Sequence, residues 1–360
     1  MAAALVLALF GVRWIAGTAP DFANLALGEQ TFDVFGSFDG DRVFCGTIKH
    51  VDECLGPARR RDLDKRVVWL GNSQLHAVNQ PKPGDTTAPV KLAAALRPKG
   101  VEVLGFSMPN ASLVELMAAA AFLESDRRID VLVVPLFLDD TREQNVREDL
   151  RLAVEPADRR AELGQLASGR YALARLQAVA SADAPAESTG VTLQQKSETA
   201  VTERLEQCCG LETARKAAHG QIDVQAYLLR NWVFGITPQS VRPILPVAYR
   251  QNLTALEDIF RIAKRHSTQV IVYVPPLRQD FKPPYDPRQY QAFKAQTQAL
   301  ARRYGAAWLD FDRLVPGRYW GTKAATRLGG KAELDFMHYQ EPGHALLAQA
   351  MTPQVEAALK

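Results

Sequence analysis

The sequence contains no Cys-x-x-Cys pair, no large excess of either charge and no apolar run long enough to span a membrane. Four cysteines without that spacing argue against a zinc ribbon or a thioredoxin-type redox site. A net charge of +3, from dispersed basic residues that are not interleaved with aromatics, argues against nucleic-acid binding. With 47% hydrophobic and 23% charged residues, the chain of 360 residues is instead a folded globular protein of one large α/β domain with insertions, or of two domains.

The N-terminus carries a short apolar run. Residues 1–12, MAAALVLALFGV, form an unbroken apolar run, whereas a membrane span needs about 20 such residues. The basic segment that precedes a signal-peptide core is missing. We expect residues 1–17 to be a signal anchor or a truncated signal sequence, which predicts a periplasmic location or anchoring at the extracytoplasmic face of the inner membrane. A buried N-terminal helix is the alternative.

The four cysteines are consistent with an exported protein. Cys45 and Cys54 lie in the segment FCGTIKHVDEC, where they can close a small disulfide loop. Cys208 and Cys209 are adjacent, a spacing that rarely pairs internally, so cross-pairs stay open. An even cysteine count together with an export-like N-terminus favours an oxidising compartment. Four buried free thiols are the alternative.

Short apolar runs separated by helical segments predict a parallel sheet in an α/β fold. The predicted core strands are Val67–Leu70, Val101–Phe106, Val131–Leu138, Val270–Val274 and Ala307–Phe311. Residues 18–65 have little periodicity, so we expect an irregular lead-in with short edge strands. The catalytic domain is expected over 66–360, with a helical insertion at about 141–246 that includes amphipathic segments at 156–180 and 199–217.

Two motifs near strand ends suggest nucleophilic chemistry. Ser73 follows the first core strand, in RVVWLGNSQLHAVNQ, and open α/β sheets place their chemistry at the carboxyl ends of strands. Asp335 and His338 form an Asp-x-x-His motif just before the last predicted helix. A serine hydroxyl needs a base to take its proton, and His338 oriented by Asp335 would supply one. His344 is a rival base, and a polar turn with a capping aspartate is the non-catalytic alternative.

A serine after the first core strand and a late Asp-x-x-His resemble the SGNH (GDSL-like) hydrolase superfamily. Here Gly71-Asn72-Ser73 stands where most members have Gly-Asp-Ser. The resemblance implies a three-layer α/β/α sandwich with a parallel sheet in flavodoxin-like order. It also implies a catalytic triad of Ser73, His338 and Asp335, without a cofactor or metal ion.

The superfamily stabilises the oxyanion with the backbone N–H of the serine, a glycine after the second core strand and an asparagine after the third. Here Met108 falls at the glycine position and Asp139 at the asparagine position. The backbone N–H of Met108 or Ser107 can still serve as a donor, and Gly105 would permit a close backbone approach.

An ionised Asp139 cannot donate a hydrogen bond to an oxyanion and would repel it. Either Asp139 is protonated, or Asn72 or Asn110 supplies the donor, or the site does something other than plain ester hydrolysis. Asp139 and Asp140 alternatively bind a cationic substrate group or an arginine such as Arg142 or Arg147. Further candidates at the rim are Arg278, which would bind substrate, and the aromatic pair Tyr319-Trp320, whose alternative is plain packing.

These departures resemble one branch of the superfamily, the DltD-like and AlgJ/AlgX-like envelope acyl-transfer proteins, over about 66–140 and 269–360. That branch implies serine-dependent acyl transfer to or from a cell-envelope glycan or polymer through an acyl-serine intermediate, as in D-alanylation or O-acetylation. It also implies a membrane-bound O-acyltransferase as partner. The alternatives are a plain periplasmic carbohydrate or lipid esterase and an inactive scaffold that binds glycan in an acylation complex.

Overall fold

The computed structural model describes residues 30–48, 56, 63–126, 128–144, 146–183, 232, 237, 239–323 and 331–360. The chain forms two compact units. One comprises Met1–Thr31, Ala182–Pro238 and Thr322–Leu334, and the other Phe32–Ser181, Gln239–Gly321 and Asp335–Lys360. Nearly all of the first unit lies outside the described residues, as do the predicted signal segment at 1–17 and the predicted helix at 199–217. The predicted domain boundaries therefore stay a prediction, and the second unit carries the sheet and every candidate site residue.

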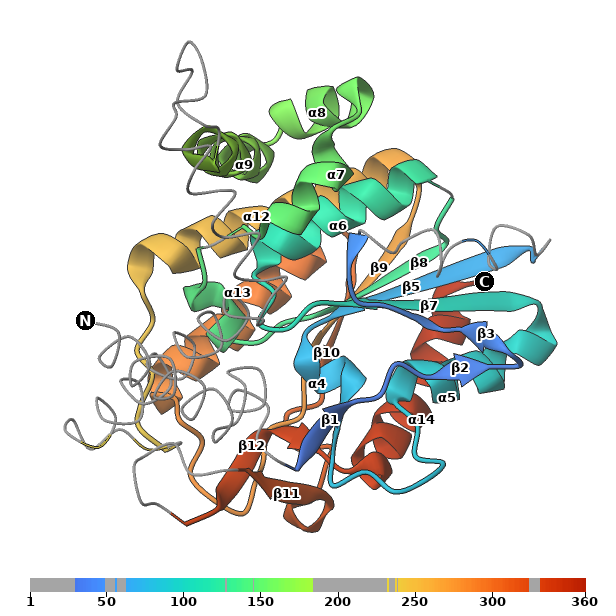
Figure 1. Cartoon of the computed structure of the whole chain (residues 1–360), viewed down its shortest axis with the longest axis vertical. Helices are drawn as coiled ribbons and strands as arrows, with labels where there is room; N and C mark the ends of the chain where they lie inside the picture. The colour runs from blue at the N-terminus through green and yellow to red at the C-terminus, as the bar shows by residue number, and fades with distance from the viewer. Residues whose placement is uncertain are drawn as a thin grey trace, which may run out of the picture. The chain divides into compact units, whose positions relative to one another are not determined.

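The second unit is built on a six-stranded sheet in the order β10-β9-β8-β5-β7-β4, with every neighbouring pair parallel (Figure 1). The strands are β4 (Phe44–Cys45), β5 (Lys65–Gly71), β7 (Val101–Ser107), β8 (Val131–Pro135), β9 (Gln269–Val274) and β10 (Ala307–Asp310). Numbering the five core strands along the chain, from β5 to β10, gives the order 2-1-3-4-5, which is the flavodoxin-like order. The prediction of one parallel sheet in this order is confirmed.

One detail of the sheet differs from the prediction. The third core strand, β8, ends at Pro135 rather than Leu138, and beyond Leu136, whose backbone N–H donates to the carbonyl oxygen of Tyr273 at 2.8 Å, the buried apolar residues leave the sheet. The expected short edge strand of the lead-in is present, because β4 pairs with β7 in parallel at the edge. Buried turns and buried strands have the same apolar composition, so hydrophobicity alone does not separate them.

Helices cover both faces of the sheet. One face packs against α6 (Leu113–Asp126), α12 (Pro246–His266) and α13 (Pro287–Arg303), and the other against α5 (Ala88–Leu96) and α14 (Glu341–Ala358) (Figure 1). Strand β5 shows why both faces need covering. Val68 and Leu70 face the first group of helices, Val67 and Trp69 face the second, and all four are buried. The expected three-layer α/β/α sandwich is present.

The start of the predicted insertion is helical. It comprises the 3₁₀ turns η3 (Asp139–Arg142) and η4 (Glu148–Leu150) and the helices α7 (Arg151–Val154), α8 (Ala157–Gly164) and α9 (Ala167–Asp183). The segment predicted as one helix over 156–180 is two helices, separated at Gln165–Leu166. Gly169 permits this corner, because a Cβ at that position would lie 2.1 Å from the carbonyl oxygen of Leu163.

Short elements complete the described chain. They are β1 (Thr31–Asp33), β2 (Ser37–Phe38), β3 (Asp41–Arg42), α4 (Ser73–His76), β6 (Ala77–Asn79), η2 (Arg97–Lys99), η5 (Gly317–Tyr319), β11 (Trp320–Lys323) and β12 (Glu333–Tyr339). The Asp-x-x-His motif lies in strand β12, directly before α14. No helix in the described ranges has both the length and the apolarity of a membrane span.

Cys45 is disulfide-bonded, and no free cysteine occurs among the described residues. The other three cysteines, at positions 54, 208 and 209, lie outside the described residues. We therefore expect no titratable thiol at Cys45 or Cys54 in the denatured, unreduced protein, measured by thiol alkylation and peptide mass spectrometry. A reduced sample labelled at all four cysteines is the control. Full alkylation of both residues before reduction would contradict the oxidising location.

Candidate active site

Ser73 is positioned by a sharp turn from strand to helix. Strand β5 ends at Gly71 and α4 begins at Ser73, with Asn72 as the N-cap whose Oδ1 accepts from the backbone N–H of Gln74 at 3.0 Å. Gly71 permits the turn, because a Cβ there would lie 2.6 Å from Cδ2 of Leu75. The turn leaves the Ser73 side chain at the carboxyl edge of the sheet, where it is 6% exposed.

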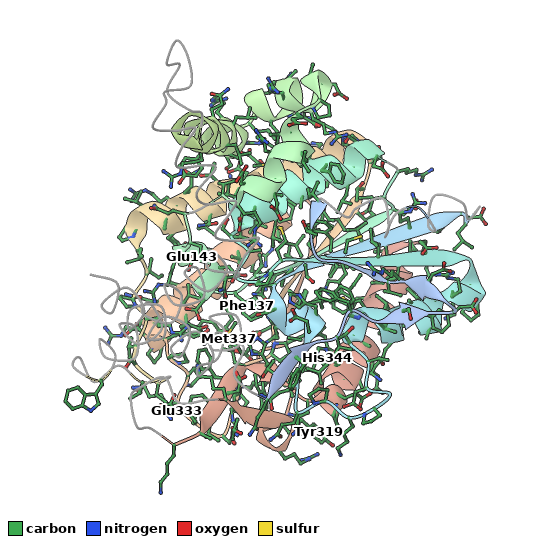
Figure 2. The ribbon with its side chains drawn as sticks, in the orientation of Figure 1. Phe137, Glu143, Tyr319, Glu333, Met337 and His344 are labelled. Carbon is green, nitrogen blue, oxygen red and sulfur yellow. The ribbon has the colours of Figure 1, made fainter. Side chains whose placement is uncertain are left out.

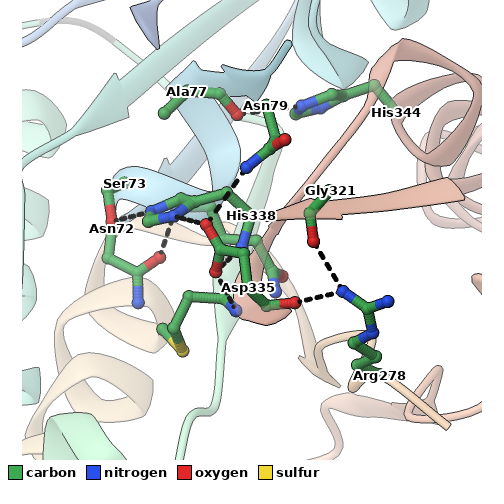
Figure 3. Close-up of polar contacts among 11 residues, drawn as sticks. Asn72, Ser73, Ala77, Asn79, Arg278, Gly321, Asp335, His338 and His344 are labelled. Atoms are coloured by element: carbon green, nitrogen blue, oxygen red, sulfur yellow. Dashed lines mark hydrogen bonds and ion pairs between the residues drawn. The ribbon is translucent and has the colours of Figure 1, made fainter. Parts of the chain in front are cut away.

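The structure joins Ser73 to the late motif through hydrogen bonds (Figure 3). Ser73 Oγ lies 3.0 Å from His338 Nε2, and His338 Nδ1 lies 3.0 Å from Asp335 Oδ2. Because a carboxylate only accepts hydrogen bonds, this geometry favours the tautomer with the proton on Nδ1. The lone pair on Nε2 then faces the Ser73 hydroxyl. This arrangement can take the proton of the serine as it attacks a carbonyl carbon.

Asp335 is held in its ionised form by several donors. Its Oδ1 accepts from the backbone N–H groups of Met337 and His338 at 2.8 and 3.1 Å. Its Oδ2 accepts from Asn79 Nδ2 at 3.3 Å, in addition to His338 (Figure 3). Hydrogen bonds to a carboxylate favour the charged form. The carboxylate is therefore available to stabilise a protonated His338.

Asn79, which sequence reasoning missed, occupies space that Gly321 leaves free. A Cβ on Gly321 would lie 1.6 Å from Asn79 Oδ1, so only glycine leaves room for the amide beside Asp335. The sequence offers no signal for Asn79, since an asparagine in the segment AVN has no distinguishing pattern.

Arg278 is buried and is bonded to the segment that carries Asp335. Its Nε and Nη2 donate to the Asp280 carboxylate at 2.7 and 3.0 Å. Its Nη1 donates to the carbonyl oxygens of Asp335 and Gly321 at 3.0 and 2.6 Å (Figure 3). The hydrogen bonds from Arg278 lower the pKa of Asp280. Arg278 thus fixes the backbone at Asp335, and the substrate contact expected of it stays a prediction.

The rival base, His344, is a structural residue on α14 (Figures 2 and 3). Its Nδ1 accepts from the backbone N–H of Ala88 at 3.3 Å, and its Nε2 donates to the carbonyl oxygen of Ala77 at 3.2 Å. Burial lowers the pKa of His344 to about 3, so the ring is neutral at physiological pH. The geometry therefore supports His338 over His344 as the base.

A second histidine, His76, is the last residue of α4, the short helix that begins at Ser73. Sequence reasoning missed this residue as well. Its Nδ1 lies 2.7 Å from the hydroxyl of Ser107, the last residue of β7. Its Nε2 lies 3.4 Å from Asp33 Oδ1, without hydrogen-bond geometry. The ring stacks on Phe35, and burial lowers the pKa of His76 to about 3. Neutral His76 therefore links the end of β7 to α4, and Ser107, expected near the oxyanion, is bonded to it.

The other predicted oxyanion donors are mostly occupied. The Met108 backbone N–H donates to the carbonyl oxygen of Gly71 at 3.1 Å, and Asn72 Nδ2 donates to both carboxyl oxygens of Asp140 at 3.2 and 3.1 Å. Asn110 is exposed, in a left-handed conformation with φ of 51°. Gly105 makes room for the ring of Phe44, which a Cβ would approach to 2.6 Å, and not for a substrate.

Asp139 is an ion-pair partner. It lies 2.5 Å from Arg242 Nη1 and accepts from the Tyr285 hydroxyl at 3.1 Å. The expected arginine partner exists, but it is Arg242 rather than Arg142 or Arg147. Arg147 instead pairs with Glu115 on α6 at 2.8 Å. The contacts with Arg242 and Tyr285 therefore occupy the Asp139 carboxyl.

The two aromatic residues expected at the rim, Tyr319 and Trp320, differ in their burial. Trp320 is buried, donates from Nε1 to the carbonyl oxygen of Val315 at 3.1 Å and packs edge-on against Tyr339. Tyr319, labelled in Figure 2, is partly buried with the Arg318 guanidinium 4.7 Å from its ring centroid. Trp320 thus follows the packing alternative.

Comparisons with known proteins give only distant likenesses. No family model and no curated protein matches the chain. Among solved structures, TesA is 11% identical with a TM-score of 0.40, covering 82% of this chain and 100% of its own. Axe2, an acetylxylan esterase from Geobacillus stearothermophilus, is 9% identical with a TM-score of 0.40, covering 81% of this chain and 94% of its own. Such low values transfer neither activity nor substrate.

The strand order and the contacts of Ser73, His338 and Asp335 are those that the sequence resemblance implies. The described sheet and these contacts therefore agree with the resemblance to the SGNH hydrolases. Within this fold the three side chains meet at the carboxyl edge of the sheet.

Proposed function

We propose that this SGNH-type protein transfers or removes acyl groups through an acyl-Ser73 intermediate. The observation that supports this most is the hydrogen-bonded chain from Ser73 through His338 to Asp335. His338 takes the Ser73 proton as Oγ bonds to the acyl carbon, and Asp335 stabilises the imidazolium. His338 then gives the proton to the departing alcohol. In the second half, His338 deprotonates an acceptor hydroxyl or water, which attacks the acyl carbon. The bond from that carbon to Ser73 Oγ breaks, and His338 returns the proton to Oγ.

The proposed acceptor is a hydroxyl of a cell-envelope glycan or polymer, and a membrane-bound O-acyltransferase is the proposed upstream partner. Both come from the resemblance to the DltD-like and AlgJ/AlgX-like branch. The proposed site of action is the extracytoplasmic face of the membrane, with the N-terminus as anchor. The disulfide bond of Cys45 supports an oxidising location.

Two other functions compete with acyl transfer. A plain esterase would use the same three residues with water as the only acceptor. A glycan-binding scaffold without activity is favoured by the occupied donors at Met108 and Asn72, because a site without an oxyanion hole lacks the largest catalytic effect.

One experiment separates the three functions. The purified protein is treated with a serine-reactive phosphonate, and separately given an aryl acetate with a rising concentration of a soluble envelope-type oligosaccharide. We expect phosphonate on Ser73 by peptide mass spectrometry, and acetylated oligosaccharide growing at the expense of free acetate. Free acetate alone at every acceptor concentration would indicate an esterase. An unmodified Ser73 without turnover would indicate a scaffold.

A further inference from the structure

Asp140 lies at the place in the sheet where a ligand is expected. It belongs to η3, which follows β8, and β8 is the neighbour of β5 in the sheet. The chain crosses to opposite faces after β5 and after β7, so the carboxyl ends of β5 and β8 form the switch point of this fold. Both oxygens of the Asp140 carboxyl accept from the side chain of Asn72, the residue before Ser73. Asp140 is thereby tied to the nucleophile turn.

The surroundings of Asp140 disfavour a negative charge. Its side chain is buried, and within the described part of the chain no lysine, arginine or histidine pairs with it. The charges facing it are Asp139 and Glu143 from its own turn and Glu115 from α6, and the Tyr273 phenol lies near it on β9. Burial first, and then these carboxylates, raise the pKa of Asp140 well above its ordinary value, against the opposing hydrogen bond from Asn72.

Asp139 and Asp140 are neighbours in the sequence with opposite environments. Asp139 has the guanidinium of Arg242 and the hydroxyl of Tyr285, which together stabilise a carboxylate. Asp140 has one neutral amide. Burying an unpaired charge costs several kcal/mol, and such a group protonates instead.

A neutral carboxyl group has one O–H to donate. Asn72 offers Asp140 only its N–H₂ group, which cannot accept that hydrogen. Asn72 is the partner that the Asp140 carboxyl has among the described residues, and Asp140 is 4% exposed. The missing acceptor is therefore expected from a bound molecule. The amide of Asn72, the backbone N–H of Met108 and the carboxyl of Asp139 are already engaged, so the oxyanion needs another donor, and the Asp140 carboxyl beside Asn72 is placed to supply one.

We propose that Asp140 is a neutral acid that donates its O–H hydrogen bond to the oxyanion formed on the acyl group at Ser73. The inference rests on the proposed acyl-Ser73 chemistry. The proton stays on Asp140 while the carbon–oxygen bond to Ser73 forms and the alcohol leaves, because only the acceptor oxygen changes its charge. Carboxylic acids kept neutral by an apolar site are effective donors of this kind.

The decisive variant is Asp140→Asn, since an asparagine carbonyl can accept from Asn72 while its N–H₂ replaces the O–H donor. We expect this variant to keep kcat for an aryl acetate within about tenfold at pH 7, whereas Asp140→Ala should lower kcat by about 10²-fold with little change in KM. Thermal unfolding checks that both are folded. If Asp140→Ala does not fold, the pH dependence of kcat in Asp140→Asn still tests the proposal.

The pH profile gives a second, independent readout. The wild type needs the protonated acid, so its kcat should fall as the pH rises through the raised pKa of Asp140. Asp140→Asn has nothing to ionise there and should lack this alkaline limb. In Glu143→Gln, whose native residue is labelled in Figure 2, a carboxylate that raises the pKa of Asp140 is removed, so the limb should move to lower pH.

Infrared difference spectroscopy tests the protonation state without activity. The carboxylic C=O band present in the wild type at pH 7 should be lost in Asp140→Asn. Its absence in the wild type, a faster Asp140→Asn enzyme or an Asp140→Ala enzyme of full activity would each overturn the proposal. A wild-type protein that neither hydrolyses the ester nor reacts with the phosphonate would overturn the proposed function. An active wild type together with Asp140 variants that keep its kcat and its pH profile would overturn only this inference.

Discussion

Ser73→Ala should abolish acyl transfer and ester hydrolysis, with a loss in kcat on the order of 10³-fold or more, because triad members act as a unit. The Ser73 hydroxyl is the atom that bonds to the acyl carbon, and no other group in the hydrogen-bonded chain can replace it. His338→Ala should lose about as much, because its Nε2, 3.0 Å from Ser73 Oγ, is the base. The rates are measured with an aryl acetate, and acyl transfer with the oligosaccharide acceptor.

The folded state should survive both changes. A serine hydroxyl contributes little packing energy, so the midpoint of thermal unfolding should stay close to that of the wild type. Ser125→Ala is the matched control, because Ser125 donates to the carbonyl oxygen of Phe122 near the far end of α6. It should retain full activity and full phosphonate labelling. If Ser73→Ala keeps its activity, Ser73 is a turn residue and the scaffold function replaces the catalytic one.

The sheet was predictable because strands buried on both faces are continuous apolar runs. Val67 to Leu70 and Val101 to Phe106 show this, and both are core strands. The pairing of Ser73 with His338 was predictable only from the motif resemblance, since nothing local in either segment specifies a partner so distant in the sequence. In a parallel sheet the segments that carry Ser73 and His338 lie at the same edge, so their side chains can reach each other.

The surroundings of the triad were not predictable from the sequence. Arg242 reaches Asp139 from a distant segment, and closer arginines such as Arg142 were equally plausible partners. The doublet Asp139-Asp140 has the composition of a surface loop, yet Asp140 is buried. His76 and Asn79 follow Ser73 closely but carry no periodic or motif signal. Burial of isolated polar side chains depends on tertiary packing, which local patterns do not record.

Asp335→Asn should lower kcat on the order of 10³-fold while leaving the fold intact, through the tautomer of His338. In this variant the amide of the new asparagine has one oxygen and one N–H₂ group in place of the two acceptor oxygens of the Asp335 carboxylate. Oδ1 accepts two backbone N–H groups, from Met337 and His338, and these would keep the amide oxygen on their side. The N–H₂ would then face His338 Nδ1 and the side chain of Asn79.

A donor facing Nδ1 makes that nitrogen an acceptor and moves the ring proton to Nε2. His338 Nε2 would then donate to Ser73 Oγ and could no longer take its proton. The loss should therefore fall on kcat and on the rate of phosphonate labelling, with KM little changed. In nitrogen-15 spectra the wild-type ring should carry its proton on Nδ1 and the variant on Nε2. Unchanged tautomers would contradict this account even if activity were lost, because the loss would then reflect the missing charge beside the imidazolium alone.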